Sequence, residues 1–285
     1  MEIIQEDLLI KKAGDLKVLP FVARKMLDTI GKETVTIDEL GSIIEKDQTI
    51  AARILKIANS PFYGLRSEVT SINHAILILG LRTIRSLVLS VSTKAIYKRF
   101  GITEQKIWEH SVGAAIGAKI ISAGLGDDIS EVAFTGGLMH DIGKVIMNNE
   151  TPEVFSEVMM KTYNDGVDAT TAEDEIYGYN HANVGAKVAE KWGLASTLVE
   201  IIGKHHLISC KLEEIEDKVL SGSLASVNLA DFICRFLGIG FRSADDTIVL
   251  HKLPSAIFLN VGKDRLDSLV NEIHEAYNNE KSAFE

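Results

Sequence analysis

Helical periodicity is the feature that most constrains this chain. Apolar residues recur at intervals of three and four in segment after segment, and no segment shows the two-residue alternation of a half-buried strand. Only 4 prolines occur in 285 residues, so few positions interrupt a helix. Hydrophobic residues make up 46% of the chain and charged residues 25%, which is ordinary globular usage. The chain is therefore expected to fold as an all-α protein.

The first hundred residues predict a bundle of about five short helices. Thr36 and Glu39 have the spacing of a capping box, Asp47 is a second candidate N-cap, and Gly31 and Gly80 are expected breaks. The polar stretch after Gly101 is a plausible joint, so we expect an N-terminal helical subdomain over residues 1–102. The expected helices span residues 16–30, 36–46, 47–58, 72–79 and 83–100.

The rest of the chain, residues 103–285, predicts a second helical subdomain with longer helices. Gly136 and Gly137 fall near the middle of one of them, where they would allow a close helix approach. The last segment is assigned to one or two packing helices by periodicity alone. The expected helices span residues 112–123, 130–147, 152–164, 181–192, 196–206 and 223–237, followed by residues 256–279.

Net charge, apolar segments and cysteine spacing indicate the cellular location and the kinds of partner to expect. The formal net charge of -10 disfavours general binding to DNA or anionic lipid. No signal-peptide core is present, and no apolar run reaches the roughly 18 residues typical of a membrane span. Cys210 and Cys234 lack metal-type spacing and are expected to be reduced. We expect a cytoplasmic protein without a membrane segment.

The histidines are clustered, since five of the 8 lie between positions 110 and 206. Imidazole and carboxylate are both ligands of first-row metals, which draws attention to His140-Asp141. Adjacent side chains on a helix diverge by about 100°. The pair would therefore serve one bridged two-metal centre, or a single metal at a helix bend. Lys144 shares the face of both residues and could hold an anionic phosphate oxygen.

Two further features add to this pair. His205-His206 is a second adjacent pair, at the end of an apolar helix, and Asp231 lies between apolar neighbours. If Asp231 points inward, its charge needs a partner, either a metal or a Lys or Arg side chain. It could equally face water, and a single histidine in a helix is more often a hydrogen-bonded core or surface residue. The prediction of a metal site therefore comes from the whole set of these residues in their order along the chain, and not from any single one.

In this order, His110, His140-Asp141 and Asp231 resemble the signature of the HD superfamily. The chain more specifically resembles the HDOD family, an N-terminal helical bundle packed on an HD-type helical domain, over roughly residues 12–210. Both halves contribute motifs: Leu19-Pro20, residues 43–47, 55–60, 71–81, 108–111 and 137–144, Glu175, Gly178, residues 181–186 and 192–194, and His205-His206.

HDOD proteins are similar to the HD-GYP phosphodiesterases, which hydrolyse cyclic di-GMP at a centre of two or three metals. Carried over by motif, the resemblance implies two divalent transition-metal ions, with Fe or Mn favoured and Zn as an alternative. Asp141 would bridge the ions, and Lys144 would stabilise charge on a leaving phosphate. One ion would be held by His110, His140, Asp141 and Asp231, and the other by Asp141, His181, His205 and His206.

Three positions depart from the relatives. The acidic residue and DG-x-GYP loop that follow the His-His pair in HD-GYP proteins are replaced by residues 207–210. Lys106 stands where some of them have a Glu four residues before the first His, which speaks against a third metal. Gln48 replaces the proline usual in HDOD relatives.

Three functions remain open. The first is a signalling module acting through a regulatory protein partner, because this chain carries no receiver, kinase or DNA-binding segment. Such a module could use a local basic face to bind its partner. The alternative is that these side chains form an ordinary solvated surface. The residues of this face are Arg82, Arg85, Lys94, Lys98 and Arg99. The second is a metal-dependent phosphohydrolase with a nucleotide or phosphate ligand, with Asp141 and Lys144 in catalytic roles. The third is an inert fold.

Overall fold

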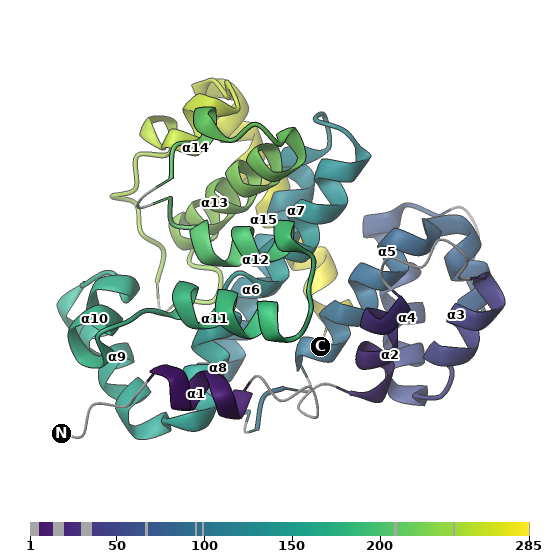
Figure 1. Ribbon diagram of the computed structural model, residues 1–285. Helices are drawn as coiled ribbons and strands as arrows, with labels where there is room; N and C mark the ends of the chain where they lie inside the picture. The colour runs from purple at the N-terminus through teal and green to yellow at the C-terminus, as the bar shows by residue number, and fades with distance from the viewer. Residues whose placement is uncertain are drawn as a thin grey trace.

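A computed structural model describes residues 6–13, 20–29, 36–65, 68–94, 96–98, 100–207, 210–241 and 243–284. Over these residues the chain folds into helices and contains no strand (Figure 1). The predicted all-α class is confirmed. The helices within residues 21–94 form a small group, and the other helices form a larger group beside it.

The smaller group contains four α-helices and one short 3-10 helix: α2 (Phe21–Thr29), α3 (Ile37–Ile44), α4 (Gln48–Ala58), η2 (Pro61–Tyr63) and α5 (Ile72–Lys94). The Thr36–Glu39 capping box and the Asp47 cap are both present. Helix α5 bends at Gly80, where φ of 82° interrupts the helical backbone. The bend separates the two predicted segments, but the second ends at Lys94 and not at Phe100.

The first predicted helix is described only in part. Helix α2 starts at Phe21, and residues 16–19, 30 and Gly31 lie outside the described residues. Helix α1 (Glu6–Ala13) was not predicted. It lies away from the smaller group and packs on the larger one, where Trp192 donates a hydrogen bond to the Ala13 carbonyl at 3.2 Å.

The larger group matches most of the predicted helices, and its elements are α6 (Ile102–Ser122), α7 (Asp127–Met139), α8 (Ile142–Glu150), α9 (Pro152–Asp165), α10 (Ala169–Tyr177), α11 (His181–Lys191), α12 (Ser196–Lys204), η3 (Leu212–Glu214), α13 (Lys218–Leu237), η4 (Leu250–Lys252), α14 (Pro254–Phe258) and α15 (Lys263–Phe284). Helix α10 was not predicted. It is short, capped by Asp168 at its start and closed by Gly178 in the left-handed region.

The prediction of one continuous helix over residues 130–147 is wrong. The helix breaks at His140-Asp141: α7 ends at Met139, Asp141 has φ -94° and ψ 13°, and α8 starts at Ile142. A single straight helix would send adjacent side chains about 100° apart. The break instead turns both side chains of the pair into the same interior region.

The hydrophobic core runs through both groups. Ile54 and Leu87 of the smaller group belong to the same buried cluster as Trp108, Phe134 and Phe284 of the larger one. Helix α15 contacts α4 as well as α6, and so joins the two groups. A boundary at residue 102, where α6 begins, remains a prediction.

Helix α13 forms the centre of the larger group. Among the described residues it is long and apolar enough to pass a length-and-composition test for a membrane span, as is the bent pair of segments within residues 72–89. However, 72% of the apolar window of α13 is buried inside the protein. It also carries the buried Asp231 and Asn228, so we interpret it as a core helix.

Candidate metal centre

Close helix packing brings the first two histidines together. A Cβ atom on Gly137 of α7 would lie 2.7 Å from the Ala114 carbonyl oxygen of α6, so only glycine permits this approach. As a result, His110 on α6 and His140 at the end of α7 place their Nε2 atoms 3.3 Å apart. The close approach that the sequence predicted for this glycine is confirmed.

A second close approach adds α11. A Cβ atom on Gly143 of α8 would lie 1.9 Å from the carbonyl oxygen of His181. The start of α8 therefore touches the start of α11, which brings Asp141 and His181 into one buried space. The Asp141 Oδ1 and His181 Nε2 atoms are 3.1 Å apart.

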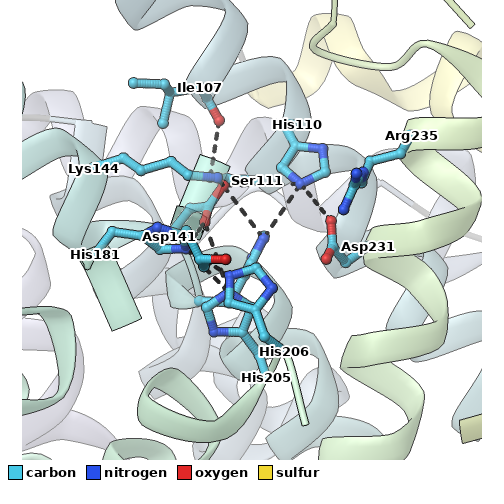
Figure 2. Close-up of polar contacts among 12 residues, drawn as sticks. Ile107, His110, Ser111, Asp141, Lys144, His181, His205, His206, Asp231 and Arg235 are labelled. Atoms are coloured by element: carbon cyan, nitrogen blue, oxygen red, sulfur yellow. Dashed lines mark hydrogen bonds and ion pairs between the residues drawn. The ribbon is translucent and has the colours of Figure 1, made fainter. Parts of the chain in front are cut away.

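Asp141 lies between two sets of histidines (Figure 2). Its Oδ2 atom is 3.5 Å from His140 Nε2 and 3.8 Å from His110 Nε2. Its Oδ1 atom is 3.1 Å from His181 Nε2 and 3.8 Å from His205 Nε2. The two oxygens of one carboxylate thus face opposite sides of the centre.

The residues on each side form a compact group. The carboxylate-rich group consists of His110, His140 and Asp231, with Asp231 Oδ1 lying 3.0 Å from His110 Nε2. The histidine-rich group consists of His181, His205 and His206. In it, His181 Nε2 is 2.9 Å from His206 Nε2 and 3.3 Å from His205 Nε2. The structure brings together all seven residues that the sequence singled out as ligands.

Four of the imidazole rings are oriented by an oxygen atom next to Nδ1, the ring nitrogen that faces away from the centre. The Nδ1 atoms of His110, His140 and His205 lie 3.2, 2.6 and 2.8 Å from backbone carbonyl oxygens, which only accept hydrogen bonds. His181 Nδ1 is 2.6 Å from a Glu173 carboxylate oxygen. For His140 and His205, a proton on Nδ1 leaves the lone pair of Nε2 pointing into the centre, which is the usual arrangement of metal-ligating histidines. The Nε2 atoms of His110 and His181 instead face carboxylate oxygens of Asp231 and Asp141.

Sequence reasoning missed Glu173. The matched family motif contains Glu175, but that side chain pairs with Lys161 at the surface. Glu173 is fully buried on the same helix and also accepts a hydrogen bond from the backbone N–H of His181, at 2.8 Å. Two carboxylates two residues apart in a short helix look alike in sequence, and only the position of α10 against α11 distinguishes them.

The carboxylates of the centre stay ionised. Burial acts to raise the pKa of Asp141, but His140, Lys144 and His181 together hold it well below its usual range. Burial also opposes ionisation of Asp231, and the hydrogen bond from His110 lowers the pKa of that carboxyl overall. Both side chains therefore carry negative charge inside the protein.

Three histidines of the centre, His140, His205 and His206, stay neutral. Burial lowers the pKa of His140 and of His205, and it lowers the pKa of His206 to about 3. His181 differs, because Glu173 more than offsets its burial and raises its pKa to about 9. A cation at the Nε2 atom of His181 would have to displace the proton that this raised pKa favours.

The distances between the candidate ligand atoms fit metal ions. Nitrogen ligands at about 2.1 Å from one metal lie roughly 3.0 to 3.4 Å from each other, and the Nε2 separations here are 2.9 to 3.3 Å. Asp141 Oδ1 is buried and makes no hydrogen bond of good geometry. The ligand atoms of His181, His205 and His206 lie within 4.8 Å of one another, as do those of His110, His140 and Asp141. Asp231 adjoins the second set through His110, at 3.0 Å.

A solvent-open cavity of about 370 Å³ reaches the centre. Lys144, His206 and Asp231 form its inner wall, and Arg235 and Asp168 lie further out. Lys144 donates a hydrogen bond to Asp141 Oδ2 at 2.8 Å, so its charge lies at the centre as predicted. The roles of these residues remain predictions.

Known structures share the fold. The chain resembles an HDOD domain protein of unknown function from Geobacter sulfurreducens, with 25% identity, a TM-score of 0.73 and coverage of 96% of this chain and 98% of that one. A candidate phosphohydrolase from Shewanella amazonensis SB2B is 24% identical with a TM-score of 0.72, covering 97% and 96%. At that identity the likeness shows the fold.

A curated relative is an uncharacterised protein from Treponema pallidum (strain Nichols), 21% identical over 227 residues. The match covers 79% of this chain but 43% of the relative, so this chain spans less than half of that protein. The family model of the HDOD domain matches residues 16–208, which include six of the seven candidate ligands; Asp231 lies beyond the match. This match covers more than half of the sequence, and the chain belongs to the HDOD family.

Proposed function

We propose that the chain is a regulatory HDOD module that binds a pair of transition-metal ions. The observation that carries the proposal is the position of Asp141, whose two oxygens face separate groups of inward-pointing imidazoles. A carboxylate shared between two sets of imidazoles is a ligand arrangement for two cations. A buried carboxylate needs positive partners, and two cations would supply them on both of its sides.

The proposed division of the ligands is the one that the resemblance implies. His110, His140 and Asp231 would hold one ion, and His181, His205 and His206 the other, with Asp141 shared. Imidazole and carboxylate without thiolate favour Fe or Mn, with Zn as an alternative. Such ions supply a polarised water and positive charge for binding phosphoryl oxygens.

Metal analysis tests the proposal directly. Protein purified without a His tag should contain about two transition-metal ions per chain, measured by inductively coupled plasma mass spectrometry. A content below about 0.3 ions per chain after aerobic or anaerobic loading with Mn, Fe and Zn would rule the centre out.

The regulatory output is proposed to pass through protein contacts in the cytoplasm. Six of the ten large hydrophobic residues that are exposed among the described ones lie in the first 102 residues. Leu77 and Ile78 on α5 are 68% and 41% exposed, which suits a partner surface. The expected basic face is less available, because Lys98 pairs with Glu150 and Lys94 lies over Phe100 and Trp108. The Arg82 side chain and Arg99 lie outside the described residues.

Phosphoester hydrolysis is a second candidate function, favoured by the cavity that opens onto the centre. Lys144 would keep a cation beside Asp141 for an incoming phosphoryl group. Metal-loaded protein should then release product from cyclic di-GMP, nucleotides or generic phosphoesters. If all of these remain intact while two metals are bound, the binding function stands and hydrolysis fails.

A further inference from the structure

The outer part of the cavity contains a cation that the family motifs do not include. Arg235 lies one helical turn after Asp231 on α13, beyond the residues matched by the family model. Figure 2 shows its side chain extending alongside Asp231 on the same side of the cluster. Arg235 and Lys144 therefore line one cavity from different helices.

The partner of Arg235 lies across the cavity. Its Nη2 atom is 3.1 Å from Oδ1 of Asp168, the residue that caps α10. The two side chains are 24% and 42% exposed, so water weakens the pair. The other Asp168 oxygen accepts hydrogen bonds from the Thr170 hydroxyl and backbone N–H. The pair can open without disturbing the helix cap.

An arginine has five N–H donors in a planar fork, which matches the oxygens of phosphate. In the absence of an anion, Asp168 takes part of that fork. From this geometry we propose that Arg235 exchanges Asp168 for the phosphate group of a small phosphomonoester, which binds in this cavity against the metal pair. The inference rests on the proposed metal centre and names the ligand class of the same site.

Charge and size support a small monoester. Three aspartates, Asp168, Asp245 and Asp246, line the outer cavity and would repel a ligand with several phosphates. A volume of about 370 Å³ is near the lower end for small-molecule sites. Phe241 and Tyr163 provide flat surfaces for the organic group. A diester, which carries substituents on both sides of the phosphate, would fit less well.

Binding to the metal-loaded protein tests the inference without requiring turnover. Calorimetry should show that inorganic phosphate binds the wild type, and that Arg235→Ala weakens binding about tenfold or more while the metal content is unchanged. Arg235→Lys should fall between them, because it keeps the charge and loses the fork. The matched control is Arg265→Ala, which removes an arginine paired with Glu272 on α15 and should bind phosphate normally.

The partner variant separates ligand binding from a structural role. Asp168→Asn keeps a side chain able to cap α10 but removes the charge that competes for Arg235. It should bind phosphate about two- to fivefold more tightly, and this gain should disappear when combined with Arg235→Ala. A merely structural ion pair predicts weaker binding for both single variants.

Competition identifies the ligand class. p-Nitrophenyl phosphate should displace inorganic phosphate, whereas bis(p-nitrophenyl) phosphate and cyclic di-GMP should not. Equal displacement by a diester would overturn the monoester assignment, and unchanged phosphate affinity in Arg235→Ala would overturn the role of Arg235. Wild-type protein that binds two metals but no phosphate refutes this inference alone, whereas protein that binds no metal refutes the proposed function on which it rests.

Discussion

The two ligand groups beside Asp141 are built differently. The carboxylate-rich group pairs two imidazoles with Asp231, and none of its three residues is more than 3% exposed. The histidine-rich group consists of three imidazoles, of which His206 is only partly buried, and its carboxylate, Glu173, lies behind His181. The carboxylate of the first group, Asp231, thus lies in the centre itself. The carboxylate of the second group, Glu173, lies outside the centre and contacts it through His181.

This difference predicts two unequal metal positions. Counting the shared Asp141, the carboxylate-rich position offers two carboxylates and the histidine-rich position one. Carboxylate oxygen suits harder ions such as Mn²⁺, whereas imidazole also suits Fe and Zn. The protein should therefore distinguish two ions chemically, and the variants below test how far the groups act separately.

Loss of Asp141 should have the largest effect because both groups share it. Asp141→Ala removes a ligand from each position and leaves the Lys144 ammonium, 14% exposed, without its partner at 2.8 Å. Metal content should fall from about two ions per chain to below about 0.3, measured by mass spectrometry on folded protein. Full metal retention would show that the assignment of Asp141 is wrong. Asp267→Ala, at an exposed carboxylate on α15, is the control.

Single histidine variants should separate the groups. We expect His110→Ala to lose the ion of the carboxylate-rich position and His181→Ala that of the histidine-rich position, each leaving about one ion per chain. The bound ions should differ when equimolar Mn and Zn are offered, with Mn depleted in His110→Ala. If both variants lose both ions, the positions are cooperative and the comparison between the groups breaks down.

The sequence indicated which residues lie together in the candidate centre better than it indicated the backbone that presents them. Capping residues such as Thr36 and Asp47 act within one turn, so their helix starts were predictable. The break at His140-Asp141 was not, because it depends on Gly143 packing against α11, a contact between distant segments. Glu173 was missed for the same reason, since its role depends on α10 approaching α11. Helix α1 was missed because it is short and packs against α8 and α11, which lie far along the chain.

Glu173→Gln should weaken only one group. The carboxylate holds the His181 ring and increases its basicity, and loss of such a partner typically costs about 10–100-fold in metal affinity. Competition with a chelator should show this loss for one ion of the two, with the other unchanged. An equal loss at both positions would mean that Glu173 acts on the fold and not on His181.

The smallest expected effect is a change in pH dependence. His206, with its pKa lowered to about 3 from 6.5, stabilises the fold above pH 6.5 and loses that contribution as pH falls toward 3. His181, raised to about 9, stabilises the fold below pH 6.5 and loses that contribution as pH rises to 9. From these groups, metal-free protein should be most stable near pH 6.5, measured by thermal denaturation.

Metal should remove the alkaline half of this dependence. An ion at the histidine-rich position requires neutral His181, so binding near pH 7 should release about one proton, measured by calorimetry in buffers of different ionisation enthalpy. The melting temperature of metal-loaded protein should then not decline between pH 6.5 and 9. A decline equal to that of metal-free protein would place the ion elsewhere.

The helix break between α7 and α8 has a consequence for how such a centre can change over evolutionary time. His140 belongs to one group and Asp141 to both, yet they are neighbours in the chain, on opposite sides of the break. Point substitutions can remove one ion position and leave the other. An insertion or deletion of one residue at the break would rotate His140 relative to Asp141 and would remove both ion positions at once. Relatives should therefore vary in single ligands far more often than in the length of this segment.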